Sequence, residues 1–365
     1  MRTHALLWML TLRSLFNLSS HSTQSALLLH LPAYPLEHGT SAASLPDALQ
    51  GWPVASINYR WGLGDQSYTN QYCSTTPLRW PTPVHDTAFA YAWLTENLAP
   101  SGTSRRDIYV YGSYLGASLA TSLALTECHS HARFGVRGVA AYNGVYNWTM
   151  FLPDHPMYRR KRTKRSASLL PEPLALGSHL VNFLEEMPAL FGQPSNLFDP
   201  FASPTLFFHG PGLNVPDSFD DYESPLSDVV SSMIGEKVEK EKVFMKPPRR
   251  SHMVFPPRIS TLKIPQTLLL HDRYDPPTEA NKRTSSRKRT GNTFKAQAEE
   301  LAGMMRRSIE KVEFKERIKW DDQIDSWEAE ALQRVQVMEL GEERHDLALG
   351  DAGQERVQEW LEDVA

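Results

Sequence analysis

Three stretches of the sequence carry residues that could together perform acyl transfer. Gly112 and Gly116 flank Tyr114, which would present its hydroxyl if the chain turns tightly there. Asp275 and His345 each follow an apolar run, so a carboxylate and then an imidazole come after the hydroxyl in chain order. Such a trio can supply a nucleophile, its base and the group that orients the base. The sequence thus predicts a site with Tyr114 in the nucleophile position, His345 as base and Asp275 as acid.

The stretch 107–125, DIYVYGSYLGASLATSLAL, predicts the turn that would position Tyr114. Its first residues are β-branched or aromatic, as in strands, and an Ala/Leu-rich helical run follows. In the turn pattern G-x-S-x-G the middle residue is exposed above the sheet, and the glycines leave room for neighbouring backbone. Tyr114 stands where that pattern has Ser. Ser113 is one place early and Ser118 lies one helical turn on, so we do not expect either to be aimed at the site.

Strand and helix patterns alternate on both sides of this turn. Such alternation predicts right-handed crossovers and a mostly parallel sheet, with Asp275 and His345 just past strand ends, at the edge where ligands bind. Asp272 is the rival to Asp275 and is expected in a turn. Asp86 and Asp351 are the expected N-caps of two helices. The expected strands are 26–31, 53–59, 136–142, 265–271 and 334–340, and the expected helices are 83–98, 293–308 and 351–364.

The stretch 143–263 has many prolines and little periodicity, which is typical of a lid or an insertion. It divides the chain into an N-terminal half-core (1–142), the insertion, and a C-terminal half-core (264–365). A short helix is expected over 184–192. The aromatic residues of this stretch could line an acyl pocket or pack the core of the lid: Phe198, Phe201, Phe207 and Phe208.

Composition limits the function classes. The net charge of −4 over 365 residues argues against a general nucleic-acid binder. The two cysteines, Cys73 and Cys128, form neither a disulfide framework nor a metal site, and no cofactor is expected. No apolar run is long enough for a membrane span, and a cytoplasmic location is favoured over secretion. Sequons at Asn17 and Asn147 would matter only after secretion. The basic runs 158–165 and 282–289 could be localisation signals, anion sites or solvated loops.

Together these motifs resemble the hormone-sensitive-lipase-like branch of the α/β hydrolases, and in particular its uncharacterised fungal members. The resemblance implies an α/β-hydrolase fold, a carboxylic-ester hydrolase activity, an oxyanion loop at His30 and Leu31, and an oxyanion contribution from Leu115. It extends from about residue 26 to the C-terminus. The matching stretches are LLLHLPAYP (27–35), VASINYRWGL (54–63), PTPVHDTAFAYAWL (81–94), the 112–116 turn, HDRYDPP (271–277) and ERHDLA (343–348).

The chain departs from that family at three points. Tyr114 replaces the nucleophilic serine. The family's oxyanion loop has glycines where this chain has Leu31, Pro32 and Ala33, and Pro32 has no N–H to donate. One oxyanion donor typically stabilises the transition state by about 3 kcal/mol. Family members also carry more chain ahead of this loop, so the sheet is expected to lack an edge, or the N-terminus to be truncated.

These departures leave two functional hypotheses. The first is an ester hydrolase of weak or lost activity, with Tyr114, Asp275 and His345 in the triad positions. The alternative is a pseudo-hydrolase that binds a small apolar ligand or a protein partner in the former active-site cleft. Tyr114 would act as a phenolic nucleophile in the first and would fill the pocket in the second.

Overall fold

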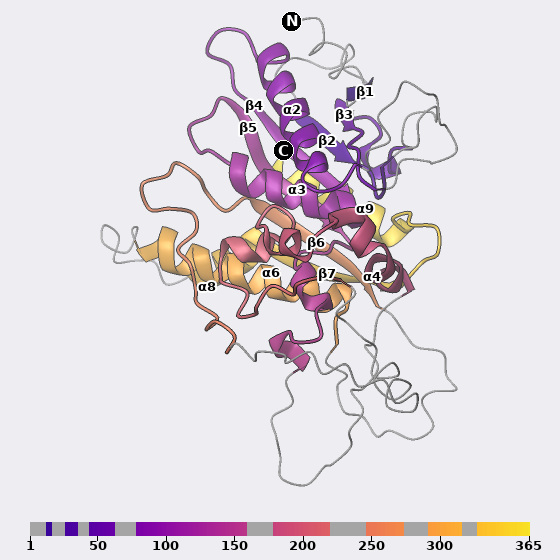
Figure 1. Ribbon diagram of the computed structural model, residues 1–365. Helices are drawn as coiled ribbons and strands as arrows, with labels where there is room; N and C mark the ends of the chain where they lie inside the picture. The colour runs from indigo at the N-terminus through magenta and orange to yellow at the C-terminus, as the bar shows by residue number, and fades with distance from the viewer. Residues whose placement is uncertain are drawn as a thin grey trace, which may run out of the picture.

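A seven-stranded sheet forms the centre of the protein (Figure 1), in a computed structural model that describes residues 12–16, 26–35, 44–62, 78–158, 178–219, 246–273, 291–315 and 327–365. The strand order is β1-β3-β2-β4-β5-β6-β7. Only β1 is antiparallel to its neighbour, β3, and the other pairs are parallel. The strands are β1 (Leu12–Phe16), β2 (Leu27–Leu31), β3 (Val54–Ile57), β4 (Arg106–Ser113), β5 (Phe134–Tyr142), β6 (Gln266–Arg273) and β7 (Val335–Glu342).

The parallel strands are apolar because helices cover both faces of the sheet. Every residue of β2 and β3 is buried. The longer helices are α2 (Thr82–Asn97), α3 (Tyr114–Glu127), α4 (Ser178–Phe191), α6 (Phe294–Ser308) and α9 (Asp351–Val364). The mostly parallel sheet, its flanking helices and the strand–turn–helix of β4 and α3 define an α/β-hydrolase fold, so the predicted fold class is confirmed.

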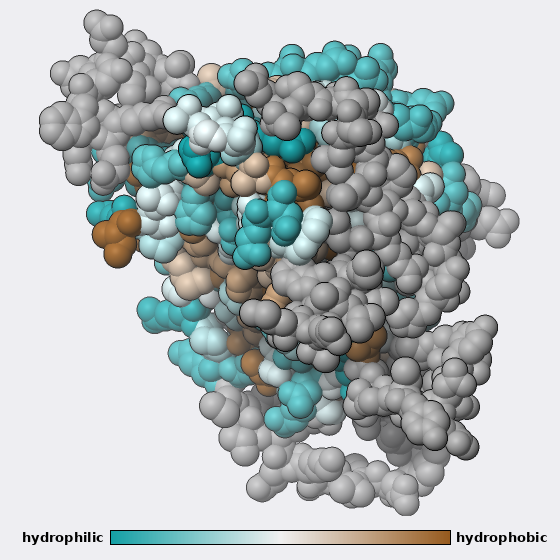
Figure 2. Space-filling view, turned by 90° about the horizontal axis from the view of Figure 1, so that it is seen from above, coloured by the Kyte–Doolittle hydropathy of each residue, from teal (hydrophilic) through white to brown (hydrophobic). Residues whose placement is uncertain are grey.

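Helices α3 and α9 lie on opposite faces of β4. A Cβ on Gly112 would meet Ala120 of α3, whereas Tyr109 packs edge-on against Trp360 of α9, with ring centroids 5.9 Å apart. Residues three apart in a strand point to opposite faces, which accounts for the two contacts. Seen from above, hydrophilic residues make up much of the described surface, and the hydrophobic areas between them are small (Figure 2).

The chain between β5 and β6 contains α4 and several short 3-10 helices, and no strand among its described residues. These short helices are η2 (Trp148–Phe151), η3 (Pro156–Tyr158), η4 (Pro194–Phe198) and η5 (Pro204–Phe207). Helix η5 contacts both α3 and α6. The described residues of this segment match the irregular pattern of 143–263, and a role for it as a lid stays a prediction.

Two predicted N-caps are wrong. Asp86 lies inside α2, which begins at Thr82, and there its buried carboxylate accepts hydrogen bonds from the Arg60 backbone and guanidinium. Gly350 holds the N-cap position of α9, and Asp351 belongs to the first turn. Besides the short 3-10 helices, the elements without a sequence prediction include β1, the π-helix η7 (Ile309–Phe314) and α8 (Trp327–Arg334).

Candidate functional site

The turn between β4 and α3 has the strained backbone that the sequence predicts. Tyr114 has φ +49°, in the left-handed region that non-glycine residues rarely adopt. The turn also approaches its neighbours closely. A Cβ on Gly116 would lie 2.3 Å from the Pro32 carbonyl oxygen, and one on Gly112 would lie 2.5 Å from the Gly116 carbonyl oxygen. Both glycines are therefore required by contact between backbones. The assignment of Tyr114 to the nucleophile position stays a prediction.

Tyr114 is completely buried among aromatic rings. Its ring centroid lies 5.2 Å from His179, 5.5 Å from Tyr142 and 5.7 Å from Phe294, with Phe183 slightly further away. Burial raises the pKa of the Tyr114 hydroxyl to about 12, although hydrogen bonding to Asn143 and Tyr142 opposes the shift. The phenol is therefore protonated at neutral pH and is a poor nucleophile.

The Tyr114 hydroxyl belongs to a closed hydrogen-bond network at the ends of β4, β5 and β6. The Asn143 side-chain amide donates to the Tyr114 hydroxyl and to a carboxylate oxygen of Asp272, both at 3.1 Å. The Tyr142 hydroxyl donates to the same oxygen at 2.5 Å, and the Asp272 amide donates to the Asn143 side-chain oxygen at 2.9 Å. Burial raises the pKa of Asp272. We call Tyr114, Tyr142, Asn143 and Asp272 the elbow cluster.

Sequence reasoning did not find Asn143, which links the other members of this cluster. It follows β5 directly and has φ +47°, a conformation that asparagine tolerates better than most residues. Its position at the carboxyl end of a predicted strand was the available signal. Asp272, predicted as a turn residue, is instead in β6 and buried.

The structure does not bring His345 into a hydrogen bond with Tyr114. His345 is exposed in a turn after β7, and Asp275 lies outside the described residues. The imidazole that contacts Tyr114 is His179 of α4, whose Nε2–H donates to the Arg344 carbonyl at 2.8 Å. The His179 amide also donates to Glu343 at 3.1 Å. The assignment of Asp275 and His345 as acid and base remains a prediction.

The predicted oxyanion loop is packed against the turn. The Leu115 amide donates to the Ala33 carbonyl at 3.2 Å. The Pro32 carbonyl accepts from the Tyr59 hydroxyl at 2.8 Å. In an oxyanion hole, the amide after the nucleophile must point at the developing oxyanion. Here the Leu115 amide is already hydrogen-bonded to the Ala33 carbonyl, so it is not free to bind an oxyanion.

The strand that leads into this loop is equally enclosed. Leu31 is fully buried, and its carbonyl would lie 2.5 Å from a Cβ on Gly116. His30 is also buried, with Nδ1 3.0 Å from the Ser56 hydroxyl. Burial lowers the pKa of His30 to about 4, so its imidazole is neutral at physiological pH. His30 therefore lies within β2 as a buried histidine with a hydrogen-bond partner.

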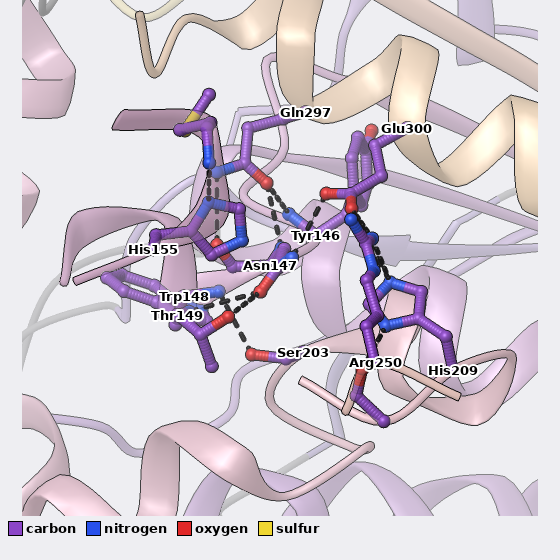
Figure 3. Close-up of polar contacts among 12 residues, drawn as sticks. Tyr146, Asn147, Trp148, Thr149, His155, Ser203, His209, Arg250, Gln297 and Glu300 are labelled. Atoms are coloured by element: carbon purple, nitrogen blue, oxygen red, sulfur yellow. Dashed lines mark hydrogen bonds and ion pairs between the residues drawn. The ribbon is translucent and has the colours of Figure 1, made fainter. Parts of the chain in front are cut away.

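A second buried polar cluster joins the segment after β5 to α6 (Figure 3). Glu300 forms an ion pair with Arg250 and accepts from the Asn147 side-chain amide at 3.0 Å. His209 lies beside both, with Nε2 2.7 Å from an Arg250 nitrogen and Nδ1 donating to the Gly210 carbonyl at 2.8 Å. Burial alone would raise the pKa of Glu300, but the hydrogen bonds from His209 and Asn147 and the Arg250 charge lower it to about 2. We call these four residues the Glu300 cluster.

The Glu300 cluster contains a histidine and a carboxylate but has no hydroxyl or thiol nucleophile among its four members. It also removes the predicted sequon at Asn147 from consideration, because that side chain is fully buried and hydrogen-bonded. In the described part of the chain, no group of His, Cys, Asp and Glu is placed to hold a metal ion. Cys128 is a free, buried thiol, and burial raises its pKa to about 11, whereas Cys73 lies outside the described residues.

The aromatic residues predicted for an acyl pocket pack elsewhere. Phe201 and Phe207 lie 5.5 Å apart, and Phe255 is 4.9 Å from Phe207 and 5.3 Å from Phe208. None of these rings is among those that surround Tyr114. Apart from Tyr158, the basic runs 158–165 and 282–289 fall outside the described residues. No helix in the described ranges is long and apolar enough to cross a bilayer.

Comparison with known proteins gives weak similarity. No family model and no curated protein matches the chain. A hyperthermophilic esterase from Pyrobaculum calidifontis is similar at 14% identity and a TM-score of 0.44, over 93% of this chain and 74% of that one. Carboxyl esterase 2 from the fungus Tuber melanosporum is similar at 10% identity and a TM-score of 0.43, over 94% of this chain and 79% of that one. A hormone-sensitive lipase from a metagenome library is similar at 12% identity and a TM-score of 0.42, over 100% of this chain and 92% of that one. The site must therefore be judged by its own geometry.

Proposed function

We propose that the protein is a pseudo-hydrolase, a protein of the α/β-hydrolase fold that does not hydrolyse esters. The proposal places it with the hormone-sensitive-lipase-like branch and its fungal members by the resemblance of its motifs. One observation carries it: the Leu115 amide, the fold's oxyanion donor, is hydrogen-bonded to the Ala33 carbonyl. Without that donor and without an N–H at Pro32, the charge of a tetrahedral intermediate would be unsupported.

The burial of Tyr114 supports the same proposal. A neutral phenol that has no exposed surface and accepts a hydrogen bond from Asn143 cannot attack a bound ester in this arrangement. The surrounding rings also fill the space above the turn. We therefore propose that a pseudo-hydrolase of this kind binds a partner protein rather than a small apolar ligand in the former cleft. We include a cytoplasmic location in the proposal.

The inserted segment contributes to closing the site. His179 and Phe183 of α4 both contact the Tyr114 ring, and His179 is bonded to the backbone beside His345. We propose that the insertion 143–263 acts as a lid through α4, its described helix that contacts the turn. In an active enzyme the corresponding position would have to admit a substrate.

Turnover of short p-nitrophenyl esters tests the proposal. Wild type, His345→Ala, Tyr114→Ser and Tyr114→Ala are expected to give the same rate, equal to that of a heat-denatured sample. Tyr114→Ser stays inactive because the Leu115 amide is still occupied. If wild type turned over the ester and His345→Ala did not, the protein would instead be an ester hydrolase with a tyrosine at the nucleophile position. This comparison does not depend on how well the Tyr114 variants fold.

A His345-dependent gain of activity in Tyr114→Ser alone would also contradict the proposal. It would mean that the oxyanion position is open in solution and that only the nucleophile was lost. Tyr114→Ala is the matched control, because it removes the same ring without supplying a hydroxyl.

A further inference from the structure

Residues 246–263 form a surface segment rich in cations, which we call the cationic strip. Its sequence, KPPRRSHMVFPPRISTLK, contains no Asp or Glu. It forms neither helix nor strand and leads directly into β6 (Figure 1). Five cations lie along it, all of them exposed: Lys246, Arg249, Arg250, Arg258 and Lys263. Only Arg250 is used by the Glu300 cluster, so four cations are available to an anionic partner.

The same segment exposes aliphatic side chains. Ile259 is 100% exposed, Val254 58% and Met253 47%. Large aliphatic groups are normally buried, and their concentration on one surface marks an interaction site. The phenyl rings of Phe255, Phe207 and Phe201 continue the apolar surface, with centroids 4.9 and 5.5 Å apart along the series.

Hydrogen bonds to the body of the protein hold these side chains outward. The Met253 amide donates to the Phe208 carbonyl at 2.8 Å, and the Lys263 amide donates to the Cys128 carbonyl at 2.9 Å. Between these anchors, the Ser260 amide closes a turn onto the Pro257 carbonyl at 2.9 Å. The exposure of Val254 and Ile259 is therefore a property of a fixed backbone.

Further cations border the strip. His252 lies 3.0 Å from an Arg307 nitrogen, and the exposed Lys311 follows on η7. Three carboxylates lie beside this edge in the described part of the chain. Glu300 is ion-paired with Arg250, Glu313 accepts from the Ile264 amide and is ion-paired with Arg334, and Glu310 is half-buried. The local charge is thus positive, although the whole chain carries a net charge of −4.

We propose that the cationic strip docks on an anionic lipid bilayer surface. Met253, Val254 and Ile259 enter the headgroup region, while Arg249, Arg258 and Lys263 face the lipid phosphates and carboxylates. Aliphatic groups on turns, interleaved with cations, suit a fluid anionic interface, where apolar burial and charge attraction add. This inference concerns a surface apart from the turn and does not depend on the loss of catalysis.

Vesicle flotation tests the proposal. The full chain is mixed at low salt with phosphatidylcholine vesicles that contain or lack phosphatidylserine. It is expected to float only with phosphatidylserine and to be released by high salt, because salt screens the attraction. Arg249→Glu combined with Arg258→Glu is expected to weaken binding at least about tenfold, since each cation near an anionic bilayer contributes about 1 kcal/mol.

A second variant and a matched control separate the two contributions. Val254→Ser combined with Ile259→Ser is expected to lower binding by about tenfold through lost apolar burial. The control is Leu332→Ser combined with Arg356→Glu, which changes an exposed leucine on α8 and an exposed arginine on α9 and should bind as wild type does. All substituted side chains are exposed, so each protein should keep its thermal unfolding midpoint.

Four results would overturn the proposal. Equal binding to vesicles without phosphatidylserine would remove the electrostatic part, and unchanged binding of both strip variants would place the contact elsewhere. Absence of vesicle binding, with dimerisation that the strip variants abolish, would assign the surface to a second copy of the chain. Absence of vesicle binding with strip-dependent capture of polyglutamate would assign it to an acidic protein segment.

Discussion

The elbow cluster and the Glu300 cluster are both polar and largely buried, and each contains an asparagine that follows β5, yet they differ in charge and place. The elbow cluster lies at the predicted catalytic turn between β4 and α3, and its hydrogen bonds run among Tyr114, Asn143, Tyr142 and Asp272. The Glu300 cluster pairs an imidazole with a carboxylate, as hydrolytic sites do, but joins the inserted segment to α6. Residue types alone therefore do not identify a catalytic site. A catalytic site also needs a donor or nucleophile left free for the substrate.

Gly116→Ala should have the largest effect on stability, because the turn between β4 and α3 depends on close contact between backbones. The new methyl group would lie 2.3 and 2.5 Å from two carbonyl oxygens of the Leu31–Pro32 segment, which cannot move independently of β2. We expect a loss of at least about 3 kcal/mol in unfolding free energy, measured by chemical denaturation. The control is Gly303→Ala in α6, where a Cβ meets nothing within 4 Å. It should stabilise the protein by up to about 1 kcal/mol.

Glu300→Gln should show how much the charge of Glu300 stabilises the protein, because it changes the pH dependence of the unfolding free energy. Glu300 has its folded pKa lowered from 4.5 to about 2, so its stabilisation is present above pH 4.5 and is lost as pH falls through 2. A shift of this size corresponds to about 3 kcal/mol. Unfolding free energies of wild type and variant should thus differ by about that amount at pH 7 and converge toward pH 2. A difference that persists unchanged at low pH would show that packing, and not ionisation, is what Glu300 supplies.

Asn143→Ala should weaken the elbow cluster by a smaller amount. It removes the donor to Tyr114 and Asp272 and leaves the buried Asp272 amide without its acceptor. It also places alanine at φ +47°. An unpaired buried group costs about 1–3 kcal/mol, so we expect a loss of about 2 kcal/mol by denaturant titration. The exposed Asn97→Ala is the control, expected within about 0.5 kcal/mol of wild type. Equal effects at both positions would show that the network adds nothing to stability.

Tyr114→Phe should have the smallest effect of the series. The ring contacts remain and the hydroxyl's contacts with Asn143 and Tyr142 are lost, while Asn143 keeps its hydrogen bond to Asp272. A loss of about 1 kcal/mol is expected from thermal or chemical unfolding. A loss as large as that of Asn143→Ala would mean that the hydroxyl, rather than the amide, organises the elbow cluster.

The sequence was sufficient to predict the turn, because its determinants are local. Gly112, Gly116 and the flanking strand and helix patterns lie within one short stretch, and the alternation around them predicted the sheet. The partners of Tyr114 could not be predicted in the same way. Asn143 and Asp272 are 129 positions apart in sequence, and His179 comes from a stretch without clear periodicity. The hydrogen bond from the Leu115 amide to the Ala33 carbonyl depends on the conformation of the loop after β2, which residue spacing does not predict.

Amide hydrogen exchange at Leu115 is the most direct test of the central claim, that the oxyanion donor is occupied. With leucine amides labelled selectively and followed by NMR, the Leu115 signal should exchange slowly, as expected for a buried amide bonded to the Ala33 carbonyl. Its protection should match that of Leu119 and Leu123 in the core of α3. Exchange close to the rate of an unstructured amide would show a donor free to bind an oxyanion and would contradict the account.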